Sequence, residues 1–131
     1  MIGVDTNILV RYLTQDDPVQ SIRATKIMEQ LFTEEQPGFV SLVAVVETAW
    51  VLQRSYGQTE RQIADTVEGL LRANTLLIQN AAEVFTAMAA CRAGTASFSD
   101  ALIASVGEWA GCSVTLTFDR KAARLNGFAL A

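Results

Sequence analysis

Four of the 14 acidic residues stand where an ordinary surface charge is not expected: Asp5, Glu47, Asp100 and Asp119. Asp5 ends the apolar stretch 2–4, and Asp119 follows the apolar stretch 114–118. Both stretches are typical of strands, and parallel strands bring their carboxyl ends to one edge of a sheet, where open α/β folds bind ligands. The sequence therefore predicts that carboxylates from distant parts of the chain meet in one cleft.

Glu47 is the most unusual of the four. It is the only charge between Phe39 and Leu52, in the stretch FVSLVAVVETAWVL. We expect Val43 and Trp50 to leave it little room for a solvent-facing side. An ionised carboxylate in apolar surroundings costs several kcal/mol unless it is paired or metal-bound.

Each carboxylate also has a purely structural explanation. Asp5 and Asp119 could cap helices, an interaction worth about 1 kcal/mol. Asp100 could interact with the dipole of the helix it begins, at roughly 0.3–1 kcal/mol. Glu47 could lie on an exposed stripe or pair with Arg54.

The combination of the four favours a metal site. Four converging carboxylates repel one another, and the chain has no histidine to offset their charge. A hard divalent cation with oxygen ligands would offset this negative charge, and Mg²⁺ or Mn²⁺ fits best. One or two such ions, about 3.5–4 Å apart if there are two, could promote phosphodiester hydrolysis, with Asp5 or Asp100 orienting the water.

Residues beside the carboxylates could support that chemistry. Hydroxyl and amide groups that could hold waters or orient the ligands are at Thr6, Asn7, Ser99 and Thr117. Basic residues that could contact phosphate, or simply be solvated, are Arg11, Arg54, Arg120, Lys121 and Arg124. The absence of histidine excludes Ser-His-Asp catalysis and His-ligated zinc.

Alternating patterns along the chain predict an α/β fold. Apolar periodicity and capping signals predict helices over 7–14, 18–32, 42–56 and 60–71, then from about 80, from about 98 and over 119–125. Helix starts are expected at Asp17 as a cap with Pro18 in the first helical position, at a capping box of Thr59 and Gln62, and at Ser97 or Ser99. The faces expected to be buried carry Ile63, Val67, Leu70 and Leu71, then Val84, Ala87, Met88 and Cys91, then Leu102, Ile103, Val106, Trp109 and Ala110. Short apolar runs predict strands at 2–4, 39–41, 75–79, 113–118 and 128–130. We expect one domain over 1–131, with three layers: a central, mostly parallel sheet of four to five strands flanked by helices.

Composition limits the environment and the partners. The net charge of −4 argues against a protein that coats nucleic acid, because non-specific binding rests on Lys and Arg. An apolar fraction of 50% and a mean hydropathy of +0.25 suggest that a partner or a second copy covers some surface. No membrane span or secretion signal is expected. Cys91 and Cys112 form no close-spaced pair, so we expect a cytoplasmic protein in which both thiols are reduced and buried.

The four acidic positions lie in segments that resemble a known family. MIGVDTNILVRYL, VVETAWVL, FSDALIAS and TFDRKAA are similar to the four acidic motifs of PIN-domain ribonucleases, and more narrowly of VapC toxins from bacterial toxin–antitoxin systems. The resemblance implies a PIN fold and Mg²⁺- or Mn²⁺-dependent endonucleolytic cleavage of tRNA, rRNA or mRNA. It also implies a homodimer that a small antitoxin wraps and blocks.

Carried over by position, Asp5, Glu47, Asp100 and Asp119 would be the metal ligands. Thr117 matches a hydroxyl that the family often has two residues before the last Asp. Some members carry a further acidic residue just after that Asp, whereas here Arg120 and Lys121 follow. This loop therefore supplies no fifth ligand for a second metal.

Two other protein classes that use carboxylates at the ends of strands fit the sequence less well. A phosphotransferase of the haloacid dehalogenase type needs a second Asp two residues after the first, where this chain has Asn7. A receiver domain is disfavoured because its acidic pair and its Lys are missing from the expected places. A catalytically degenerate PIN-like binding or dimerisation module, and a PIN nuclease of RNA processing outside a toxin–antitoxin pair, remain alternatives.

Overall fold

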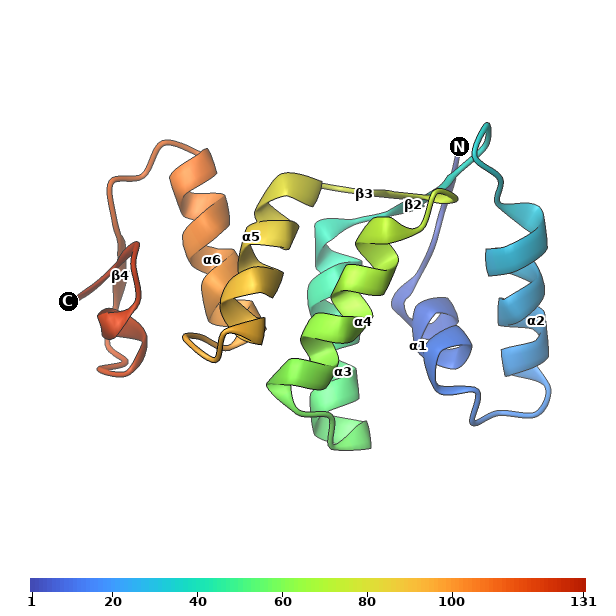
Figure 1. Cartoon of the computed structure of the whole chain (residues 1–131), viewed down its shortest axis with the longest axis horizontal. Helices are drawn as coiled ribbons and strands as arrows, with labels where there is room; N and C mark the ends of the chain where they lie inside the picture. Colours follow the sequence, from blue (N-terminus) through green and yellow to red (C-terminus); the bar gives the residue numbers. More distant parts are fainter. The chain divides into compact units, whose positions relative to one another are not determined.

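The computed structural model describes residues 1–131, which divide into two compact units (Figure 1). Unit 1 comprises residues 1–58 and 69–81, and unit 2 comprises residues 59–68 and 82–131. Strands alternate with helices in the order that the sequence predicts, and every paired strand is parallel to its neighbour. The predicted α/β class is confirmed, while the single domain over 1–131 stays a prediction.

Unit 1 is built on a three-stranded parallel sheet in the order β1-β2-β3. The strands are β1 (Ile2–Gly3), β2 (Gly38–Val40) and β3 (Leu76–Ile78). Val40 on the central strand is fully buried. Gly38 is required there because a Cβ at this position would lie 2.5 Å from the ring of Phe32.

Helices α1 (Thr6–Thr14) and α3 (Leu42–Tyr56) position the polar residues of unit 1 and pack against each other. Leu9 of α1 and Leu52 of α3 are fully buried. The side chain of Ser41 begins α3 by accepting a hydrogen bond from the Ala44 N–H at 3.1 Å. Gly57 ends it with a left-handed φ of 65°, so the predicted bounds of α3 are confirmed.

Between them, α2 (Gln20–Lys26) continues into a π-helical turn (Ile27–Leu31). Asp17 Oδ1 accepts hydrogen bonds from the backbone N–H groups of Val19 at 3.0 Å and Gln20 at 2.7 Å. The predicted capping role of Asp17 is confirmed. Pro18 lies in the turn before the helix instead of at its first position.

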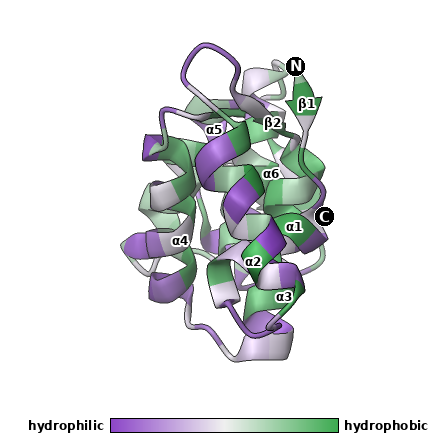
Figure 2. Ribbon diagram, turned by 90° about the vertical axis from the view of Figure 1, so that its right-hand side faces the viewer, coloured by the Kyte–Doolittle hydropathy of each residue, from purple (hydrophilic) through white to green (hydrophobic).

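Helix α4 (Glu60–Arg72) begins with the predicted capping box. Gln62 Oε1 accepts from the Thr59 N–H at 2.9 Å, and Thr59 Oγ1 accepts from the Gln62 N–H at 3.2 Å. Ile63, Val67 and Leu70 are buried, as the periodicity predicts. Hydrophilic residues colour the remaining surface of this helix purple in Figure 2.

Unit 2 contains helix α6 (Phe98–Trp109) and all of α5 (Ala81–Arg92) except its first residue, which belongs to unit 1. Strands β4 (Thr115–Thr117) and β5 (Phe128–Leu130) form a parallel pair. The buried face of α5 is the predicted one: Val84, Ala87, Met88 and Cys91.

Three expectations for this region are corrected. The five strands form a three-stranded and a two-stranded sheet, not one sheet, because β4 and β5 hydrogen bond only to each other. The helix expected over 119–125 is a short 3₁₀ turn (Ala122–Arg124), because the backbone is already extended at Leu125, with φ −81° and ψ 147°. On α6, Ile103 and Trp109 are exposed although a buried face was expected.

No helix of the chain is both long enough and apolar enough to cross a membrane.

Candidate active site

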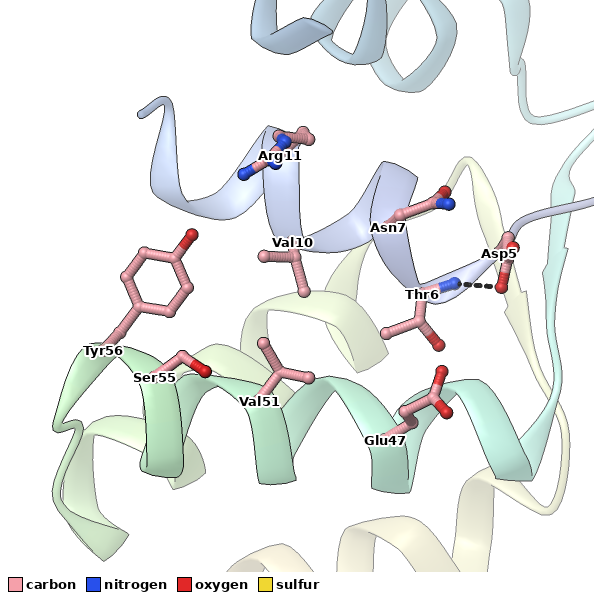
Figure 3. A pocket seen from close by; sticks show the side chains of 9 residues that line it. All are labelled: Asp5, Thr6, Asn7, Val10, Arg11, Glu47, Val51, Ser55 and Tyr56. Atoms are coloured by element: carbon pink, nitrogen blue, oxygen red, sulfur yellow. Dashed lines mark hydrogen bonds between the residues drawn. The ribbon is translucent and has the colours of Figure 1, made fainter. Parts of the chain in front are cut away.

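An elongated pocket of about 380 Å³ runs between α1 and α3 within unit 1 (Figure 3). Asp5 and Glu47 lie at one end of it, and Val10 and Val51 line its middle. The other end is formed by Arg11, Ser55 and Tyr56. The fold therefore brings together two of the four predicted carboxylates, from a strand–helix junction and from the second turn of a helix.

Asp5 has the geometry of a helix cap. Its backbone is extended, and Oδ1 accepts a hydrogen bond from the Thr6 N–H at 2.7 Å. The structural explanation for this residue is therefore correct. It does not exclude a ligand role, because the cap uses one carboxylate oxygen and the side chain is exposed to the pocket.

Glu47 is exposed, and the expectation of a carboxylate in apolar surroundings is wrong. The buried face of α3 is made by Ala44, Val45, Thr48, Ala49 and Leu52. Val43, Glu47 and Trp50 lie on the opposite, exposed face, with 74% of Val43 and 51% of Trp50 accessible. The alternative of an exposed stripe is the correct one, and desolvation gives no argument for a metal at Glu47.

Arg54 does not form the salt bridge to Glu47 that was considered as an alternative. Its guanidinium lies 4.8 Å from the centre of the Trp50 ring, a cation–π contact on the exposed side of α3. Arg54 is outside the lining of the pocket.

Thr6 and Asn7 follow Asp5 into the pocket lining. Thr6 is buried, and Figure 3 shows its side chain and that of Glu47 pointing toward one another. Asn7 is exposed on the same end of α1. The first turn of α1 thus places a hydroxyl and an amide beside the two carboxylates.

A hydrogen-bonded network holds the opposite end of the pocket. Arg11 donates from Nε to Gln20 Oε1 at 2.9 Å and from Nη1 to Asp16 Oδ1 at 3.2 Å. The Tyr56 hydroxyl donates to Asp16 Oδ2, and the Thr14 hydroxyl donates to Asp16 Oδ1. These two hydroxyls hold the pKa of the Asp16 carboxyl below its usual value.

Sequence reasoning missed Val10, Val51, Ser55 and Tyr56. The signal was nevertheless present, because Glu47, Val51 and Ser55 are four residues apart and share one face of a helix. Only the placement of α1 beside that face shows that it lines a pocket.

In unit 2, Asp100 lies in the first turn of α6 and is partly exposed. The cap of this helix is Ser97, whose Oγ accepts from the Asp100 N–H at 3.2 Å. Of the two serines considered for the cap, Ser99 is therefore not the one used. Asp100 is in the position that the helix dipole favours.

Asp119 holds the turn that leads into the 3₁₀ turn of unit 2. Its Oδ1 accepts from the Lys121 N–H at 2.8 Å and from the Ala122 N–H at 3.3 Å. Thr117 Oγ1 accepts from the Asp119 N–H at 3.0 Å, so the hydroxyl two residues earlier fixes the backbone of Asp119. Arg120 is exposed, while Lys121 and Arg124 border a separate pocket of about 730 Å³.

The side chains around Asp5 and Glu47 suit a hard cation. They supply carboxylate, hydroxyl and amide oxygens, and no histidine exists in the chain. Neither unit gathers three or more carboxylates, thiols or imidazoles at one point, so unit 1 offers a partial ligand set of two carboxylates. Divalent ions such as Mg²⁺ retain several waters and accept a set of this kind.

Comparison with known protein families identifies the class of protein to which this α/β fold and acidic pocket belong. A family model described as the PIN domain matches residues 2–127, and the chain belongs to the PIN domain family. PIN domains are generally nucleases, and they generally use divalent metal ions. Comparison with individual curated proteins finds no match.

Proposed function

We propose that this PIN domain is an endoribonuclease that depends on Mg²⁺ or Mn²⁺ and cleaves phosphodiester bonds of RNA. The observation that supports this most strongly is the pocket that Asp5 and Glu47 share, with Thr6 and Asn7 beside them. We propose Asp100 and Asp119 as further metal-binding carboxylates, on the similarity of their segments to the family's acidic motifs.

The chain's own residues have defined tasks in this proposal. When bound, one or two divalent ions would lower the pKa of a water and stabilise the leaving oxygen. Asp5 and Glu47 would hold the metal, and because Glu47 is exposed, folding does not carry the penalty of burying its charge. Thr6 and Asn7 orient waters, and Arg11 contacts phosphate through Nη2, the guanidinium nitrogen that makes no hydrogen bond within the protein.

We further propose that the chain is the toxin of a VapBC-type pair and acts as a homodimer that a small antitoxin inhibits. The similarity of all four acidic segments to VapC toxins supports this role. The net charge of −4 suits a partner with a basic segment.

Metal-dependent cleavage of RNA by the purified chain tests the catalytic proposal. We expect cleavage with Mg²⁺ or Mn²⁺, none with EDTA, and a loss of at least about 100-fold in kcat/KM for Asp5→Asn and for Glu47→Gln. Such a loss corresponds to about 2.7 kcal/mol of transition-state stabilisation.

Glu34→Gln is the matched control, because Glu34 is an exposed carboxylate in the turn before β2 and its substitution makes the same change of charge. This variant should keep wild-type activity. Undiminished cleavage by both Asp5→Asn and Glu47→Gln would refute the proposal and favour a contaminating nuclease or a different site.

A further inference from the structure

The end of the pocket opposite the carboxylates has the chemistry of a nucleobase subsite. Tyr56 is the last residue of α3, and the residue is 37% exposed. Figure 3 shows its ring standing at that end, beside Val10 and Arg11 and away from Asp5. An aromatic ring that borders a pocket in this way can stack on a base of single-stranded RNA.

Two restraints fix the ring. Its hydroxyl donates to Asp16 Oδ2, and Asp16 is itself held by Thr14 and Arg11. Its backbone is held because Gly57 ends the helix with a left-handed φ, and the Gly57 N–H donates to the Leu52 carbonyl. A ring that is already ordered loses little side-chain entropy when it stacks on a ligand.

The size and lining of the pocket match one nucleotide. Its volume of about 380 Å³ is at the small end of the range for ligand pockets. From Glu47 to Tyr56, α3 rises about 13 Å, at about 1.5 Å per residue. Along this length a nucleotide would meet oxygen ligands, then the apolar side chains of Val10 and Val51, then an aromatic ring and a guanidinium.

We infer that Tyr56 stacks on the base of an RNA nucleotide next to the scissile phosphate, while Arg11 contacts a neighbouring phosphate. This inference rests on the proposed ribonuclease function and adds a positioning residue to it. Because stacking is sequence-tolerant, Tyr56 fixes the place of the strand more than the identity of the base.

The test combines variants of Tyr56 with RNA that lacks one base. A short single-stranded RNA is prepared with an abasic nucleotide on either side of the cleaved bond, and kcat and KM are measured. We expect one of the two abasic substrates to raise KM for the wild-type protein roughly five- to hundred-fold. Tyr56→Ala should raise KM for the intact RNA by a similar factor and should no longer distinguish the abasic substrate.

Tyr56→Phe keeps the ring and should keep the preference for the intact base. Tyr12→Ala is the matched control, because Tyr12 lies on α1 outside the lining of the pocket. It should behave as the wild type. If Tyr56 had a purely structural role, Tyr56→Ala would still show the rise in KM that a missing base causes. The intact and abasic RNA can be compared on the wild-type protein even if a variant fails to fold.

The outcomes separate the two proposals. If the wild type cleaves RNA but treats the abasic and intact substrates alike, the subsite is wrong and the ribonuclease stands. The subsite is also wrong if the abasic RNA raises KM by the same factor in the wild type and in Tyr56→Ala. If the wild type cleaves no RNA with either metal, both proposals fall.

Discussion

Asp5 shows that a capping role and a site role are compatible in one residue. Its Oδ1 caps α1 through the Thr6 N–H, yet the same side chain borders the pocket. The capping role is confirmed, and the sequence alone could show it because a carboxylate at a strand–helix junction can satisfy the first N–H groups of the helix. The metal-binding role of Asp5 stays a proposal. Glu47 borders the same pocket, but the expectation of apolar surroundings is wrong, since Val43 and Trp50 are exposed beside it.

The two cysteines should differ sharply in reactivity. Cys91 is buried, and its Sγ lies 3.1 Å from both Glu60 Oε2 and the Glu60 carbonyl oxygen, the two acceptors that its single S–H faces. Burial, together with the Glu60 carboxylate, raises the pKa of the Cys91 thiol to about 12. Cys112 is exposed, so the expectation that both thiols are buried is wrong for this residue. Because only a thiolate reacts, Cys91 stays unreactive from pH 7 to pH 9, well below its raised pKa.

A colorimetric thiol reagent measures this difference. In the native protein we expect one fast-reacting thiol, and a second that reacts only when denaturant unfolds the chain. Cys112→Ser should remove the fast phase, while Cys91→Ser should leave it unchanged. Two thiols of equal rate under native conditions would contradict the burial of Cys91.

At the scale of elements, prediction succeeded where local signals agree. Helix α3 begins and ends at the predicted residues because Ser41 caps it and Gly57 stops it. The capping box of Thr59 and Gln62 and the buried face of α5 are also confirmed. In each case the deciding interactions lie within one turn of the helix, so the sequence alone contains them.

Prediction failed where the outcome depends on distant partners. Strand pairing is set by contacts between segments far apart, so the sequence could not show that β4 and β5 form a sheet of their own. The same holds for Tyr56, whose neighbour Asp16 is 40 positions away along the chain. Exposure of Ile103 and Trp109 likewise depends on packing that helical periodicity does not specify.

At the scale of the whole molecule, composition gives the strongest constraint. The chain combines a net charge of −4 with exposed apolar side chains such as Trp50 and Phe85, which are 51% and 54% accessible. For the proposed RNA substrate, the acidic charge restricts phosphate contacts to a few local basic residues, of which Arg11 borders the pocket. Exposed apolar surface favours burial against a second copy or a partner protein.

The molar mass of the protein in solution tests the proposed homodimer directly. Light scattering or sedimentation equilibrium at micromolar concentration should give twice the chain mass of 14.2 kDa. A single species at the chain mass, up to high micromolar concentration, would contradict the homodimer. It would leave the nuclease proposal untouched, because that proposal is tested by cleavage.

The central claim is that Asp5, Glu47, Asp100 and Asp119 bind a divalent metal. Anomalous scattering from a crystal soaked in Mn²⁺ tests it most directly, since manganese stands in for magnesium at sites with oxygen ligands. We predict an anomalous peak in contact with carboxylate oxygens of Asp5 and Glu47, and we propose Asp100 and Asp119 as the further carboxylate ligands. Manganese bound only elsewhere, with none of these four side chains in contact, would contradict the claim.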